Sequence, residues 1–103
     1  MLSDSNFVAK GLNISCASFG DSTYVLFEND GSLIELNEIG SFIWACLSGT
    51  RQISEIQAMC EEVYDGDRVI IQDSVREFIA SLLQMGAIEI SESKFAGEMQ
   101  HGN

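Results

Sequence analysis

The stretch that decides the fold runs from Asp30 to Trp44 and reads DGSLIELNEIGSFIW. Asp30 and Gly31 supply the backbone freedom that a tight hairpin turn requires. Residues 32–36 then predict a short strand, and Asn37 is suited to cap a helix because its side-chain oxygen can accept from the free amides of a first turn. A turn, a strand and an amphipathic helix therefore follow one another without an intervening loop.

Two segments before this stretch also have the composition of β-strands. Residues 14–19, ISCASF, end at a Gly-Asp turn, and residues 24–28, YVLFE, are rich in β-branched and aromatic side chains. Together with residues 32–36 they predict an antiparallel meander, in which the last two strands form the hairpin. Residues 1–12 are polar with few apolar positions, and we expect them to form a flexible N-terminus.

Three helices are predicted after the meander. The first ends at Ser48-Gly49, where glycine can adopt the left-handed conformation, and the second ends near residues 64–67. The third begins near Asp73 and closes at Gly86. Apolar residues recur at helical spacing along the second and third helices: Ile53, Ile56, Met59 or Cys60, and Val63; then Val75, Phe78, Ile79, Leu82 and Leu83. Residues 87–90 predict a short extended segment that packs back on the core.

This order of elements predicts one α+β domain with a winged-helix-like arrangement, in which a three-stranded antiparallel sheet is followed by three helices. A chain of 103 residues buries only a modest core and leaves little room for an enclosed active site. We expect the folded domain to span residues 13–90 and residues 91–103 to form a flexible tail.

The charge of the chain excludes some classes of partner. Five Lys and Arg against sixteen Asp and Glu give a formal net charge of −11, which repels nucleic-acid phosphates and anionic membrane surfaces. The N-terminus lacks the basic and apolar regions of a signal peptide, and no apolar run reaches the roughly 20 residues of a membrane helix. We therefore expect a cytoplasmic protein, with its three cysteines reduced.

The chain carries no convincing catalytic or metal-binding constellation. His101 is the only histidine and lies in the tail, so triads and histidine-based metal sites have no partner. Cys46 and Cys60 fall on the buried sides of helices, where free cysteine behaves as a small hydrophobe. Asp65 and Asp67 lack the further ligands of a calcium loop. We expect no catalytic residues, no metal and no cofactor.

The pattern instead predicts a strand edge that is a candidate binding site for an extended chain. If residues 32–36 form the last strand of the meander, one side of that strand can be unpaired and can offer its amides and carbonyls to an extended chain. The third helix could then form the other wall of a groove for that added strand. The sequence does not determine which face of the helix would line the groove.

Several runs of residues share one pattern: Asp30-Gly31, Leu36-Asn37-Glu38, Ile43-Trp44, Leu47-Ser48-Gly49-Thr50-Arg51, Ile53-Ser54-Glu55-Ile56, Tyr64, Val75-Arg76-Glu77-Phe78-Ile79, Leu82-Leu83 and Gly86. This pattern, over about residues 14–90, resembles the PqqD-like domains, also called RiPP recognition elements. RiPPs are ribosomally synthesised and post-translationally modified peptides. The resemblance implies a free-standing, non-catalytic adaptor that binds the leader segment of a precursor peptide and presents it to a modifying enzyme, such as a radical-SAM enzyme, a protease or a cyclase.

The resemblance also implies where the leader peptide binds. In the family the leader adds as a strand beside the third strand of the meander and lies against the third helix. Carried over, this predicts the following peptide-binding residues: Ser32, Leu33, Ile34, Glu35 and Leu36 on the strand, and Arg76, Ile79, Ala80 and Leu83 on the helix. Arg76 is the one cation among these positions and could meet an acidic leader residue.

Two other functions remain open from the sequence. A winged helix can serve as a transcriptional or anti-activator module, although the charge opposes DNA binding, and a small domain can simply stabilise an enzyme partner. The sequence does not identify the precursor peptide, its pathway or the partner enzyme. It is compatible with either a monomer or a dimer.

Overall fold

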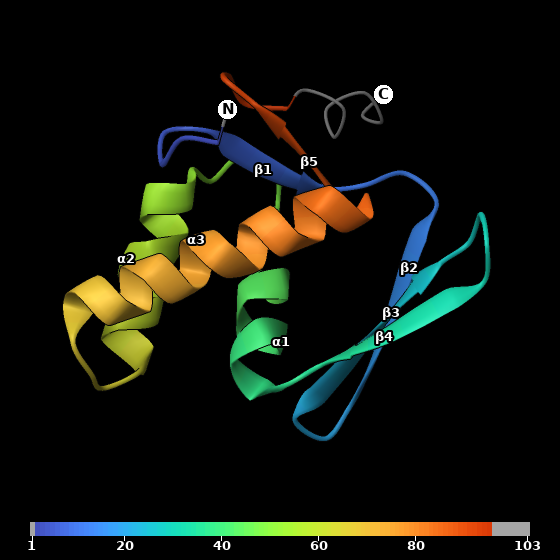
Figure 1. Ribbon diagram of the computed structural model, residues 1–103, viewed down its shortest axis with the longest axis horizontal. Helices are drawn as coiled ribbons and strands as arrows, with labels where there is room; N and C mark the ends of the chain where they lie inside the picture. The colour runs from blue at the N-terminus through green and yellow to red at the C-terminus, as the bar shows by residue number, and fades with distance from the viewer. Residues whose placement is uncertain (1, 96–103) are drawn as a thin grey trace.

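The computed structural model describes residues 2–95; the expected tail residues 96–103, His101 among them, lie outside the described residues. Figure 1 shows a small sheet beside three helices, with a second pair of strands above the helices at the top of the view. The elements in chain order are β1 (Phe7–Lys10), β2 (Ile14–Phe19), β3 (Ser22–Phe27), β4 (Ser32–Leu36), α1 (Glu38–Ala45), α2 (Ile53–Val63), α3 (Arg68–Met85) and β5 (Ile88–Ser91).

The predicted meander is confirmed. Its strands lie in the order β2-β3-β4, and both neighbouring pairs are antiparallel. In the β3–β4 hairpin Phe27 lies opposite Ser32, and the amide of Gly31 donates to the carbonyl of Phe27 at 2.8 Å. Gly31 has a φ of 77°, which explains why a glycine follows Asp30 at this turn.

The structure contains a second sheet, made of β1 and β5, of which only β5 was predicted. The extended segment at residues 87–90 is confirmed as β5, but residues 7–10, expected within a flexible N-terminus, form the strand that pairs with it. Four residues are too few to show a periodic pattern, and this strand is held by its neighbours. The carbonyl of Val8, which is fully buried, accepts from Gly49, and the amide of Gly11 donates to Ala87.

The helix ends follow the predictions at Asn37 and Gly86 and differ at two other places. Helix α1 ends at Ala45, with Cys46 as its C-cap, rather than at the predicted Ser48-Gly49. The side chain of Asn37 accepts from the amide of Gly40 at 2.8 Å, and Gly86 closes α3 with a φ of 84°. However, α3 begins at Arg68, with Asp67 rather than Asp73 as its N-cap. The early start was hidden because the first turn carries exposed apolar side chains that break the buried stripe.

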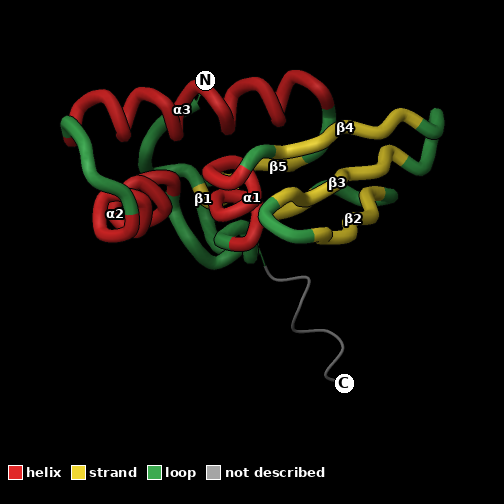
Figure 2. Tube along the Cα trace, turned by 90° about the horizontal axis from the view of Figure 1, so that it is seen from below, coloured by secondary structure: helices red, strands yellow, loops and turns green. Residues whose placement is uncertain are grey.

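The core lies between the inner face of the three-stranded sheet and the helices. Figure 2 shows α1 packed directly beside this sheet, α2 at the far end of the molecule, and α3 running along one side of both. Cys46 and Cys60 are buried as predicted, and Trp44 is buried beside them, whereas Val63, assigned to the buried stripe of α2, is exposed. The predicted α+β, winged-helix-like fold is confirmed. Among the helices of residues 2–95, none combines the length and apolarity that crossing a bilayer requires.

Candidate functional site

Strand β4 forms one edge of the three-stranded sheet. It pairs with β3 along its whole length, and no other strand of the described chain lies against its second side. Ile34 and Leu36 turn toward the core, so Leu33 and Glu35 turn toward the exposed outer face of the sheet. Alternate backbone amides and carbonyls of β4 therefore point away from the sheet and are open to an added strand.

Helix α3 runs beside this open edge, and one hollow lies near each end of β4. The first, of about 400 Å³, lies beyond the end of β4; it is lined by Asn37, Ile39 and Gly40 of α1 with Ile70, Ile71, Ser74 and Phe78 of α3, among others. The second, of about 220 Å³, lies between the end of α3, at Met85 and Gly86, and the hairpin-turn end of the sheet. The sheet side of this hollow is lined by Leu12, Asn13, Ile14, Phe27, Asn29 and Asp30. Strand β4 thus runs antiparallel to α3, and Figure 2 shows it as the strand of the sheet nearest that helix.

One face of α3 lines both hollows. Ile71, Ser74, Phe78 and Met85 follow one another at intervals of three, four and seven residues, so they lie along a single side of the helix. The ring of Phe78 packs so closely on α1 that a Cβ atom at Gly40 would lie 3.2 Å from it. We call this side of α3, together with the open edge of β4, the edge groove.

The first hollow is chemically suited to an apolar side chain. Ile39 and Ile70, at its rim, are 47% and 64% exposed, and Phe78 and Ile71 form much of its wall. The polar groups around it are few, and Tyr64 is one of them. Burial, followed by the negative charge of Glu38, raises the pKa of the Tyr64 hydroxyl, so this group stays neutral and can act as a hydrogen-bond donor.

The predicted strand residues lie at the edge groove, in different orientations. Ser32, Leu33 and Glu35 are exposed, Ile34 is half-buried and Leu36 is buried in the core. A peptide that pairs with β4 would therefore contact the backbone of this strand more than its side chains. The carboxylate of Glu35 already accepts from the hydroxyl of Ser22 at 3.0 Å.

The four predicted helix residues do not line either hollow. Ile79 is fully buried in the core, and Ala80 lies two positions after Phe78, roughly opposite it on the helix. Leu83 is half-buried and packs against the core. The α3 face that lines the first hollow carries Ser74 and Phe78 instead.

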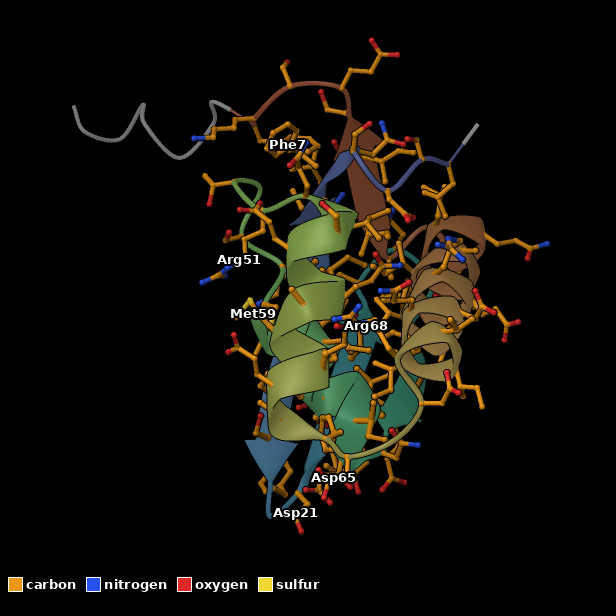
Figure 3. All side chains as sticks on the ribbon, turned by 90° about the vertical axis from the view of Figure 1, so that its left-hand side faces the viewer. Phe7, Asp21, Arg51, Met59, Asp65 and Arg68 are labelled. Carbon is orange, nitrogen blue, oxygen red and sulfur yellow. The ribbon has the colours of Figure 1, made fainter. Side chains whose placement is uncertain are left out.

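Arg76 forms hydrogen bonds within the protein itself. Its guanidinium donates to Asp4 at 3.1 and 2.8 Å and to Asp73 at 2.8 Å. The hydrogen bonds and charge of these carboxylates raise the pKa of Arg76, and the group remains a cation bound within the protein. Figure 3 shows the side chains over this end of the molecule, where Arg68 lies between α2 and α3; its guanidinium is paired with Glu61 at 3.2 Å.

Sequence reasoning missed Ser74 and Met85 as groove residues and assigned Phe78 only to the core. The available signal was the pair of apolar residues at the start of α3, Val69 and Ile70, which are 61% and 64% exposed. Two neighbouring apolar side chains outside the buried stripe indicate a second apolar face on the helix.

Comparisons with known proteins agree with this geometry. Residues 23–88, well over half of the chain, match the family model described as coenzyme PQQ synthesis protein D (PqqD). No curated protein sequence matches the chain.

Two solved structures share the fold. One is described as TbiB1 in complex with the TbiA(beta) leader peptide; it is 23% identical, with a TM-score of 0.73, and the match covers 79% of this chain and 94% of that one. The other, lasso peptide synthetase B1 complexed with the leader peptide, is 17% identical, with a TM-score of 0.72, and the match covers 80% and 96%. The family match, the sheet with its open edge and the helix beside it lead to the same conclusion, that this chain belongs to the PqqD family.

Proposed function

We propose that this protein is a non-catalytic adaptor that binds the leader segment of a ribosomally synthesised precursor peptide and presents it to a modifying enzyme. The leader adds as a strand to the open edge of β4 and lies in the edge groove. The observation that carries this proposal is the unpaired side of β4 facing an apolar wall of α3, with hollows at both ends.

The backbone of β4 supplies the first part of the affinity. Ladder bonds alternate along a strand, starting from the pair that closes the hairpin, Phe27 and Ser32, so we expect the amides and carbonyls of Leu33 and Glu35 to face the leader. Two residues offer about four hydrogen bonds, each contributing about 0.5–1.5 kcal/mol net. Such bonds are independent of the peptide's side chains and give no selectivity.

Selectivity then comes from the hollows. The larger hollow at Phe78 accepts an apolar or aromatic leader residue, and the smaller one at Met85 accepts a second residue farther along the bound strand. With β4 only five residues long, these two anchors also fix the register of the added strand.

Both structures that share the fold carry a leader peptide according to their descriptions, which supports the same use here. The partner is a modifying enzyme of the pathway, such as a radical-SAM enzyme, a protease or a cyclase, and the complex works in the cytoplasm. A regulatory role on DNA is disfavoured by the net charge of −11 and by α3 itself, whose Arg68 and Arg76 are both paired with carboxylates.

The test is titration of a fluorescein-labelled leader peptide from a candidate precursor peptide, with fluorescence anisotropy as the readout. We expect a dissociation constant of about a micromolar or lower, since ordering the leader offsets part of the interaction energy. A scrambled peptide of the same composition is the control. Equal binding of the two peptides, or no binding of either, would refute the proposal.

A further inference from the structure

The outer face of the three-stranded sheet carries an apolar patch that the edge groove does not use. Because side chains alternate along a strand, the outer face consists of three rows across the sheet: Ser15-Leu26-Leu33, Ala17-Tyr24-Glu35 and Phe19-Ser22. The helices lie on the opposite face, as Figure 2 shows, so no element of the described chain covers these rows.

This patch consists of large apolar side chains that are exposed to solvent. Phe19, Leu33 and Leu26 are 68%, 60% and 36% exposed, and the rings of Phe19 and Tyr24 meet edge to face with centroids 5.8 Å apart. A shallow hollow of about 540 Å³ lies among these side chains and Ala17. Exposed apolar residues are ordinary when scattered, but a contiguous group around a hollow is typical of a protein-binding surface. We call these five residues the outer patch.

The rim of the outer patch is acidic. Glu28, at one end, accepts from the hydroxyl of Ser15, and Glu35, at the β4 side, accepts from Ser22. Between Gly11 and Thr50 the sequence contains five acidic residues and no Lys, Arg or His. The whole sheet therefore presents one sign of charge around an apolar centre, which selects a partner of the opposite sign.

We propose that the outer patch docks the modifying enzyme, through a surface on that enzyme that has an apolar centre ringed by lysine and arginine. This inference rests on the proposed function. A leader strand added beside β4 would extend the same sheet, so its alternate side chains would stand next to Leu33 and Glu35 on the outer face. An enzyme on this face contacts adaptor and leader together, which couples its recruitment to the presence of substrate.

Charge argues against a second copy of this chain as the occupant. Two outer patches placed face to face would bring two acidic rims together, on chains that each carry a net charge of −11. Like charges across an interface oppose association, and most strongly at low ionic strength. A basic rim on the enzyme is instead attracted by this negative charge, which raises the rate at which the two proteins associate.

The experiment measures two affinities on the same variants: that of labelled leader peptide, by anisotropy, and that of the purified modifying enzyme acting on the same precursor, by biolayer interferometry with leader present. Phe19→Glu places a charge in the patch at an exposed position. Val63→Glu, on α2 with 56% exposure, makes a similar change outside the outer patch, at a hollow on the other face of the sheet. Phe19→Ser repeats the test without added charge. Circular dichroism confirms the fold of each variant.

We expect both Phe19 variants to weaken the enzyme complex at least about tenfold while leader affinity changes by less than about twofold, and Val63→Glu to match the wild type. We also expect the wild-type complex to weaken as NaCl rises from about 50 to about 500 mM. If leader fails to bind the wild type, the proposed function is refuted. If leader binds but the Phe19 variants recruit the enzyme normally, only the docking inference is overturned.

Two further outcomes would also overturn the inference. A loss of leader affinity equal to the loss of enzyme affinity would make the outer patch part of the peptide site. Sedimentation that shows a wild-type dimer dissociated by Phe19→Glu, with the enzyme complex intact, would assign the patch to a second copy of this chain.

Discussion

Asp4 and Arg76, 72 positions apart in the chain, are joined by two hydrogen bonds of 3.1 and 2.8 Å. This pair fastens the segment before β1 to the middle of α3. The hydrogen bond from Arg76, more than any other cause, lowers the pKa of the Asp4 carboxyl below its ordinary value of 3.8. The pair is partly exposed, with side-chain exposures of 41% and 40%, so its effect on stability is small but directional.

A folded-state pKa below the ordinary value means that the stabilisation is present above pH 3.8 and is lost as the pH falls through the lower folded-state value. We therefore expect Asp4→Asn to lower the midpoint of thermal unfolding at neutral pH and to have a vanishing effect at strongly acidic pH. Differential scanning calorimetry across this range measures both. Asp73→Asn, which removes the more exposed neighbour, serves as the control. A deficit that grows toward acid would contradict the assignment.

The open edge of β4 predicts that proline has different effects at neighbouring positions of this strand. Proline removes one amide, so Glu35→Pro deletes a bond to the leader, whereas Ile34→Pro deletes a bond to β3 inside the hairpin. We expect Glu35→Pro to fold and to bind leader at least about tenfold more weakly, and Ile34→Pro to lose the hairpin. Anisotropy and circular dichroism measure the two effects.

Glu35→Ala is the matched control, because it removes the carboxylate and keeps the amide. It should bind leader within about twofold of the wild type, since backbone bonds dominate at this position. Strand addition is wrong if proline at both Leu33 and Glu35 yields folded proteins with unchanged leader affinity.

The face of α3 that lines the edge groove can be identified by filling it. Ser74→Trp places a large ring in the hollow beside Phe78, and Ala80→Trp places the same ring on the other side of the helix. Both positions are exposed, so both variants should fold. We expect Ser74→Trp to weaken leader binding at least about tenfold and Ala80→Trp to leave it nearly unchanged. The reverse result would restore the wall predicted from sequence.

The cap at Asn37 connects the fold to the groove. Its side chain accepts from the amide of Gly40 at 2.8 Å, and the residue also lines the larger hollow. We expect Asn37→Ala to destabilise the protein by about 1 kcal/mol, because an N-cap oxygen is lost, and Asn37→Ser to retain most of the stability. Urea unfolding measures both. Equal stability of the alanine and serine variants would show that the cap contributes little.

The sequence predicted most strongly where a local rule determines the structure. The turn at Gly31, the cap at Asn37 and the end of α3 at Gly86 each depend on one residue's backbone or hydrogen-bonding chemistry, and all three are confirmed. The open edge of β4 followed from the order of the strands in a meander, which needs no side-chain detail.

What could not be predicted depends on partners distant in the sequence. Phe7–Lys10 become a strand because β5 and the turn at Gly49 accept and donate bonds to them, and nothing within those four residues indicates this. The groove face of α3 is set by the direction in which the helix crosses the sheet. Periodicity identifies Ile79 as buried, but it cannot choose between the faces on either side of it.

The pairing of β1 with β5 has a practical consequence for engineering. The first and last strands of the described chain lie side by side at the top of Figure 1, whereas the Gly31 hairpin turn lies at its right-hand edge. A second polypeptide joined directly before β1 or directly after β5 would therefore start from the same side of the molecule, away from the hairpin turn of β4. The unit is consequently suited to being built in line into a larger multidomain enzyme, as well as to acting in trans.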